Sequence, residues 1–403
     1  MGVKENIPNS ANNKRALVMT LSYPSADPRP KRMIRFLQDN HYQVDLFSYP
    51  FNREPIEGIK KHHVIPKPKY DLLSKIIRNL HEMTPVVTGL IQGKKMKEHL
   101  ILSRYELPPF LERFKDEVYD LIVVQDLFLL PIAFSMKKQA KVLFDAREYY
   151  PAQYEDEWFF KMFGKREADW LCSQYLSKCD ALITVSPGLK KRYDEEFHVN
   201  FEIMRSVPDS VSLSVVDVRK DQIRMVHHGG AIRSRKIENM IEITKKLGDG
   251  FTLDLYLTGE KGYLAELKEM VKSIHNVNIN DPIAFDRIIP TINQYDIGLY
   301  YLEPASFNLK YCLPNKLFEF IQARLMVVIG PSPDMADVVN RYGCGVVSDE
   351  FSIDSMVDII STLSTDKVQA YKVKSHEAAF DLCFEKEKKV LETLISNILP
   401  ANE

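Results

Sequence analysis

The chain has 403 residues, of which 45% are hydrophobic and 27% charged, and its formal net charge at pH 7 is −1. This is an ordinary globular composition, and it excludes disordered, collagen-like and coiled-coil chains. The length predicts two or three domains. The near-neutral charge argues against a dedicated nucleic-acid-binding protein, which normally carries a basic excess.

Short apolar runs alternate with amphipathic patterns along the whole chain. Continuous apolar runs of this kind are typical of parallel strands covered on both faces. The predicted strands are 16–21, 44–48, 121–125, 142–146, 181–186, 223–227, 253–257, 277–279, 297–302 and 326–329. Helical patterns lie between them, as at 237–247. The alternation predicts an α/β protein with two doubly wound domains.

The two halves of the chain differ in charge: the first 200 residues carry a net +5 and the remaining 203 a net −6. We therefore expect two domains with different partners. The predicted boundaries are a loose N-terminus at 1–14, a first domain at 15–205, a linker at 206–221, a second domain at 222–383, and a C-terminal helix at 384–403. The sequence leaves open whether this helix packs back on the first domain.

Cysteine usage and hydropathy bear on the compartment. The five cysteines form no C-x-x-C pair, which favours free thiols in a reducing environment. No run approaches the ~20 apolar residues of a membrane span, and residues 1–13 have no apolar signal core. We expect a cytoplasmic protein.

One candidate binding segment is 225–236, where a predicted strand ends at Gly229 and Gly230 and is followed by Arg233, Arg235 and Lys236. Glycines let backbone N–H groups approach an anion, and the following helix N-terminus adds positive charge. The segment predicts a diphosphate site; the alternative is a plain turn with solvated basic residues. It is neither a G-x-G-x-x-G nor a Walker motif.

The same strand ends with a histidine pair, His227 and His228. Strand alternation sends these two side chains to opposite faces, so we expect one to reach the site and the other to be structural. With no cysteine or carboxylate at ligand spacing, the pattern argues against a zinc site.

A second candidate segment is 313–323, in which Pro314 suits the first turn of a helix. Lys316 and Glu319 are three residues apart and so share one side of that helix. They could present a cation to phosphate and a carboxylate to ribose hydroxyls. The alternative is a solvated ion pair of little energetic importance.

Six segments in this order resemble motifs of one branch of the GT-B glycosyltransferases, the family-4-like group with a P-N-K-x-F-E signature. They are SADPRPKR at 25–32, YDLIVVQD at 119–126, FDAREYYP at 144–151, CDALITVS at 179–186, DIGL at 296–299 and LPNKLFEFIQA at 313–323. Each motif is short, but six in the family's order make the resemblance specific.

The resemblance implies two Rossmann-like domains facing each other across a cleft, the first for an acceptor and the second for a nucleotide-sugar. It also implies retaining chemistry without a metal or any cofactor besides the nucleotide-sugar co-substrate, and the sequence has no D-x-D motif. Arg235 matches the family's diphosphate-contacting cation, Lys316 its motif lysine, and Glu319 the glutamate that holds the ribose.

The predicted site residues follow from these matches. The nucleotide-sugar site comprises Gly229, Gly230, Arg233, Arg235, Asn315, Lys316 and Glu319. The predicted catalytic residues are Arg235 and Lys316, which stabilise the departing diphosphate, together with the carboxylates Asp126 and Glu148. The alternative for Asp126, which ends a predicted strand, is a helix cap.

The sequence departs from the family pattern at several positions. Gln125 and Arg147 replace two histidines that are acid–base candidates, and Tyr311 replaces the first of the family's two glutamates. Ser206 stands where the family usually has an asparagine, in an N-x-P-D-like stretch at the joint between the predicted domains. The sequence therefore assigns no general base.

A basic stretch in the first domain, residues 58–104, holds ten Lys/Arg against three Asp/Glu with apolar residues interleaved. Amphipathic helices of this kind can lie on anionic lipid. We expect peripheral contact with the cytoplasmic face of a membrane or guidance of a lipid-linked acceptor. The alternative is a solvated helix packed on the core.

Taken together, the sequence predicts a hexosyltransferase that moves a sugar from a nucleotide-sugar, with UDP expected, to a glycan or lipid-linked acceptor in surface polysaccharide synthesis. Two alternatives remain: a non-catalytic nucleotide-sugar-binding partner, and a nucleotide-sugar 2-epimerase.

Overall fold

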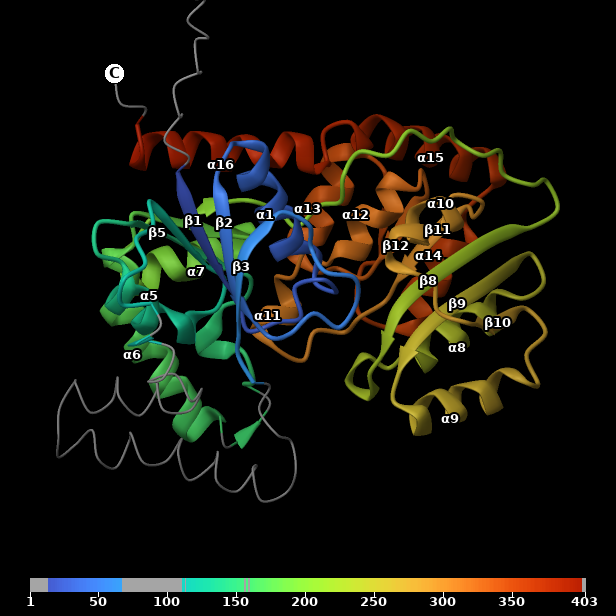
Figure 1. Cartoon of the computed structure of the whole chain (residues 1–403). Coiled ribbons are helices and arrows are strands. Elements are labelled where there is room, and N and C mark those ends of the chain that lie inside the picture. Colours follow the sequence, from blue (N-terminus) through green and yellow to red (C-terminus); the bar gives the residue numbers. More distant parts are fainter. Residues whose placement is uncertain (1–13, 67–110, 113, 156, 159, 401–403) are drawn as a thin grey trace, which may run out of the picture. The chain divides into compact units, whose positions relative to one another are not determined.

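The computed structural model describes residues 14–66, 111–112, 114–155, 157–158 and 160–400 (Figure 1). Its chain divides into two compact units. The first consists of the described parts of Met1–Thr184, Lys190–Glu202 and Glu392–Glu403, and the second of Val185–Leu189 and Ile203–Leu391. Most of the basic stretch, 67–104, lies outside the described residues, so its membrane contact stays a prediction.

The first unit is built on a seven-stranded sheet in the order β3-β2-β1-β4-β5-β6-β7. The strands are β1 Arg15–Met19, β2 Gln43–Ser48, β3 Ile59–Val64, β4 Leu121–Val124, β5 Lys141–Ala146, β6 Ala181–Thr184 and β7 Glu202–Ile203. Along this order, each neighbouring pair from β3 through β2, β1, β4 and β5 to β6 is parallel. The helices are α1 Pro28–Asp39, η1 Leu127–Leu129, α5 Leu130–Met136, η2 Tyr150–Ala152, the π-helix η3 Phe160–Gly164, α6 Lys165–Tyr175 and η4 Leu176–Lys178. Two further helices, α7 Pro187–Phe197 and α16 Phe384–Ile398, have residues in both units.

The second unit is built on a six-stranded parallel sheet in the order β10-β9-β8-β11-β12-β13. The strands are β8 Ile223–Ala231, β9 Phe251–Gly259, β10 Val277–Asn280, β11 Ile297–Tyr300, β12 Met326–Ile329 and β13 Gly345–Val347. The helices are η5 Arg233–Arg235, α8 Glu238–Leu247, α9 Lys261–Val271, η6 Phe285–Arg287, α10 Ile288–Ile292, α11 Phe307–Lys310, α12 Asn315–Gln322, α13 Pro333–Tyr342, α14 Ile353–Ser361 and α15 Thr365–Ala379.

All ten predicted strands are present, and the two parallel sheets confirm the predicted α/β class. The sequence missed β3, β7 and β13, which are edge strands. An edge strand is covered on fewer sides, so it lacks the continuous apolar run of a central strand. In β3, for example, residues 59–64 are all half-buried or exposed.

The strand order reverses at one point in each unit, between β1 and β4 in the first and between β8 and β11 in the second. In a doubly wound sheet the connections leave this point on opposite faces, so a crevice forms at the carboxyl ends of the two strands. In the second unit those ends carry the histidine pair, the two glycines and Tyr300.

Helix α12 packs closely on this part of the sheet because Gly298 of β11 has no side chain. A Cβ atom at Gly298 would lie 2.2 Å from the ring of Phe320, which is fully buried on α12. Pro314 is the N-cap of α12, so it lies immediately before the predicted first turn and not within it. Within the described residues, every helix is too short or too polar to cross a bilayer.

We expect Gly298→Ala to lower the free energy of unfolding by about 1–3 kcal/mol, because the added methyl group would overpack the seat of α12. The matched control is Gly250→Ala, where a Cβ meets no atom within 4 Å. Urea denaturation of both variants tests this. Equal midpoints for the two would show that α12 does not need the close approach.

Candidate functional site

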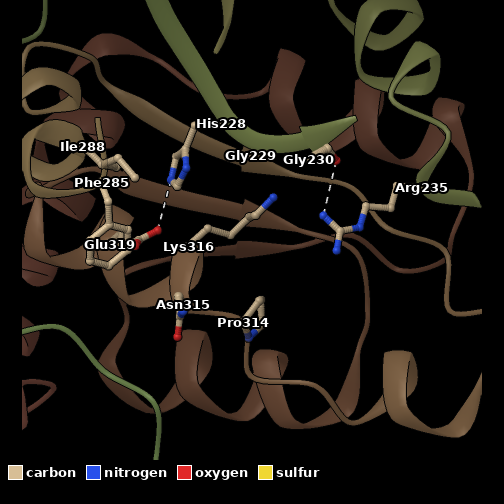
Figure 2. Close-up of a pocket in the computed structure, with 10 residues that line it drawn as sticks. All are labelled: His228, Gly229, Gly230, Arg235, Phe285, Ile288, Pro314, Asn315, Lys316 and Glu319. Atoms are coloured by element: carbon tan, nitrogen blue, oxygen red, sulfur yellow. Dashed lines mark hydrogen bonds and ion pairs between the residues drawn. The ribbon is translucent and has the colours of Figure 1, made fainter. Parts of the chain in front are cut away.

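A pocket of about 280 Å³ lies between the carboxyl end of β8 and the first turns of α12 in the second unit (Figure 2). It is lined by His228, Gly229, Gly230, Arg235, Phe285, Ile288, Pro314, Asn315, Lys316 and Glu319. Six of these are predicted nucleotide-sugar contacts: Gly229, Gly230, Arg235, Asn315, Lys316 and Glu319. The fold therefore brings segments 225–236 and 313–323, which are about 90 residues apart, into one site.

The glycine pair forms one edge of the pocket. Gly229 has a φ of +118°, which strains any L side chain, and a Cβ there would lie 3.1 Å from the Lys316 Nζ. The neighbouring Gly230 accepts a hydrogen bond from the Arg235 guanidinium through its backbone carbonyl, at 3.3 Å. The glycines thus leave room for two cations at the strand end.

Lys316 is almost fully buried, with 9% of its surface exposed. Its Nζ lies 3.3 Å from Nε2 of His227 and 4.9 Å from the centre of the Tyr300 ring. Burial lowers the pKa of the Lys316 ammonium to about 7, and the nearby positive charge of Arg235 acts in the same direction. The predicted alternative, a solvated ion pair with Glu319, does not describe this buried side chain.

Glu319 and His228 meet on the other side of the pocket, with Oε2 of Glu319 3.3 Å from Nε2 of His228 (Figure 2). Burial, with help from Lys316, lowers the pKa of His228 to about 3, so the ring is neutral and the contact is not an ion pair. Within the described residues, this Nε2 has no hydrogen-bond partner. A buried polar atom of this kind is suited to a ligand.

Of the histidine pair, His228 lines the pocket and the buried His227 does not, although both rings contact α12. His227 contacts Lys316 and His228 contacts Glu319. Two apolar side chains, Phe285 of η6 and Ile288 of α10, complete the pocket. Sequence reasoning missed them because a single phenylalanine or isoleucine in a short helical segment carries no pattern.

Arg233 lies outside this set of lining residues. Its side chain is 60% exposed, pairs with Glu266, and lies 5.0 Å from the centre of the Tyr263 ring. Its neighbour Lys236 likewise pairs with Glu303, at 3.0 Å. The basic cluster predicted from the sequence therefore divides into solvated pairs and the pocket cation Arg235.

Asp126 and Glu148 belong to the first unit, at the carboxyl ends of β4 and β5. The Asp126 carboxylate accepts hydrogen bonds from the Leu21 backbone N–H at 2.7 Å and from Thr20 Oγ1 at 3.2 Å. It makes no side-chain cap to the following helix. Burial raises the pKa of both Asp126 and Glu148, and the charge of Arg147 opposes this.

The two positions where the resembled motifs have histidines, Gln125 and Arg147, are engaged in hydrogen bonds and ion pairs. Arg147 contacts Asp27 at 2.5 Å and Asp126 at 3.4 Å. The Gln125 side chain donates a hydrogen bond to Asp145 at 2.9 Å. The Asp145 carboxylate also accepts hydrogen bonds from Nε and Nη2 of the buried Arg29. These side chains form a charge network in place of titratable imidazoles.

Tyr311, at the position of a glutamate in the resembled motif, follows the last residue of α11, and its ring centre lies 4.9 Å from that of Phe307. It does not line the pocket. Among the described residues, no group of three or more His, Cys, Asp or Glu side chains is placed to hold a metal ion.

No protein-family model and no curated protein sequence matches this chain. Solved structures do match it along almost its whole length. Sucrose-phosphate synthase from Thermosynechococcus elongatus is 11% identical, with 96% of this chain and 100% of that chain covered and a TM-score of 0.68. HepE from Anabaena, solved with UDP and glucose, is 13% identical, with 95% and 100% covered and a TM-score of 0.65.

A third similar structure is WaaG, a glycosyltransferase involved in lipopolysaccharide biosynthesis, at 10% identity, with 96% and 100% covered and a TM-score of 0.62. At such identities the likeness shows a shared fold. The two units have the GT-B fold, with one Rossmann-like sheet each. The predicted fold class is confirmed.

The buried lysine makes stability depend on pH. Between pH 7 and 10.5 the folded chain has released the Lys316 proton that the unfolded chain still holds, so stability rises with pH. From pH 7 to 9.5 we expect the free energy of unfolding of wild type to rise by on the order of 2 kcal/mol relative to that of Lys316→Met, which lacks the amine. Urea denaturation of both proteins at both pH values measures it, and a constant difference would contradict the lowered pKa.

Proposed function

We propose that this chain is a glycosyltransferase that transfers a sugar from a nucleoside-diphosphate sugar to an acceptor. The observation that carries the proposal is the pair of pocket cations, Arg235 and Lys316. Within the described residues neither makes an ion pair, whereas Arg233 and Lys236 on the same segment each have a carboxylate. A buried lysine and a half-buried arginine, neither of them in an ion pair within the described residues and both beside a glycine edge, suit a diphosphate.

The rest of the pocket suits the nucleoside. Glu319 and His228 offer an acceptor and an unpartnered ring nitrogen for ribose hydroxyls. Phe285 and Ile288 offer an apolar wall for a planar base. The structure of HepE with UDP-glucose supports UDP as the first nucleotide to test.

In the proposed reaction, negative charge develops on the diphosphate as its bond to the sugar breaks. Arg235 and Lys316 would stabilise that charge from fixed positions, and so act more strongly in the transition state than in the bound donor. The P-N-K-x-F-E resemblance supports retaining, metal-independent transfer of a hexose to a glycan or lipid-linked acceptor in surface polysaccharide synthesis.

Binding is tested by a thermal-shift panel of UDP-, GDP-, ADP- and TDP-sugars without added metal. Saturating ligand should raise the apparent stability by a few kcal/mol. We expect Arg235→Met to weaken binding by about 10- to 100-fold, because it loses a charged hydrogen bond. The matched control is Arg233→Met, which removes a guanidinium outside the pocket; equal weakening in both variants would contradict the assignment.

Turnover is tested by following UDP release from the nucleotide-sugar that binds. We expect slow hydrolysis without acceptor, and a fall in kcat of about 100-fold or more in Lys316→Met. Binding without any hydrolysis or transfer would favour a non-catalytic nucleotide-sugar-binding partner. The presence of Tyr311 where the resembled motif has a glutamate is the sequence feature that supports this alternative. Interconversion of the free donor would instead identify an epimerase.

A further inference from the structure

His227 connects the pocket lysine to the neighbouring strand. Its Nδ1 lies 2.9 Å from the Leu299 carbonyl oxygen of β11, which can only accept, so Nδ1 carries the proton. The other ring nitrogen, Nε2, then has a free lone pair and lies 3.3 Å from the Lys316 Nζ. The ring stacks on Tyr300 with an interplanar angle of 5° and a centroid distance of 5.9 Å.

This arrangement fixes the amine from two directions. His227 accepts from it on one side, and the Tyr300 ring lies beneath it at 4.9 Å. Both supports come from the sheet, whereas Lys316 comes from α12. The amine is thereby held at the Gly229 edge, where a ligand diphosphate would lie.

Six charged or titratable groups from five elements surround the amine. They are His227 and His228 of β8, Arg235 of η5, Glu319 of α12, Tyr300 of β11, and Cys312 of the preceding loop. Burial lowers the pKa of both histidines, raises the pKa of the Cys312 thiol to about 11, and raises the pKa of the Tyr300 hydroxyl. These four groups therefore stay neutral near pH 7. The amine, with its pKa of about 7, does change charge there.

We infer that His227 is the positioning residue for Lys316, and that the two together couple diphosphate binding to the uptake of one proton. The inference rests on the proposed function. Above pH 7 the free site holds Lys316 as a neutral amine that donates to His227. When a diphosphate enters, a proton from solvent adds to the Nζ lone pair, and the resulting ammonium pairs with a phosphate oxygen.

The probe is UDP-glucose, whose diphosphate diester has no group that titrates between pH 6.5 and 9 and whose uracil ring stays protonated at pH 8. Calorimetry at pH 8 in buffers of different ionisation enthalpy counts the protons taken up. We expect close to one proton per ligand in wild type, and an affinity that falls up to tenfold per pH unit above pH 7. In Lys316→Met binding is weaker and this pH dependence is lost.

The role of His227 is tested by two amides. His227→Asn can still donate to Leu299 but does not reach the lysine, whereas the oxygen of His227→Gln can replace Nε2. We expect His227→Asn to bind about tenfold more weakly and to shift the midpoint of the pH profile about one unit lower, because the ammonium loses an acceptor. His227→Gln should restore both. His275→Asn, at an exposed histidine paired with Asp249, is the matched control.

Each outcome has one meaning. UDP-glucose binding by wild type without proton uptake at pH 8 overturns the coupling. An unchanged pH profile in His227→Asn, or the same loss in His227→Asn and His227→Gln with both variants folded, overturns the positioning role. Absence of any nucleotide-sugar binding by wild type overturns the proposed function itself, and this inference with it.

Discussion

The removal of the Lys316 amine from water is the constraint on which the pocket depends. Burial of an ammonium is unfavourable unless nearby groups replace its hydration. Here the replacement is incomplete: a neutral imidazole and an aromatic ring contact the amine, and Arg235 opposes its charge. A site in this condition gains most from an anionic ligand, because the amine makes no ion pair within the described residues and the charge of Glu319 only partly offsets its burial.

The sheet geometry explains how a lysine can be held in this way. Gly298 lets α12 approach β11 through Phe320, which brings the first turn of the helix to the end of β8. Gly229 then leaves the space that the amine occupies. One glycine therefore sets the position of the helix and the other admits its side chain, so the two packing contacts and the charge arrangement depend on one another.

The fold was predictable from the sequence because central parallel strands are buried on both faces and appear as continuous apolar runs. The edge strands β3, β7 and β13 escaped because burial on fewer sides leaves no such run. In the site, the glycines, Arg235, Lys316 and Glu319 were found because they fall on short, recognisable segments. Phe285 and Ile288 were missed because their role comes from tertiary placement.

The sequence could not predict which of the basic residues line the pocket. Arg233, Arg235 and Lys236 look equivalent in a basic segment, yet the structure pairs two of them with surface carboxylates and leaves Arg235 in the pocket. Spacing also suggested a solvated pair for Lys316 and Glu319, since helical periodicity shows which residues share a side but not what covers that side. Only the packing of α12 on the sheet decides it.

The first unit adds a chemical argument. Where the resembled family has two histidines, Gln125 and Arg147 are committed to Asp145 and to Asp27 with Asp126. An arginine does not give up its proton near neutral pH, and an amide does not titrate, so neither can act as a general base. On the proposed function, these two positions add no acid–base catalysis, and Arg235 and Lys316 stabilise the departing diphosphate. The lysine that is hardest to keep charged is thus one of the two that the reaction would require most.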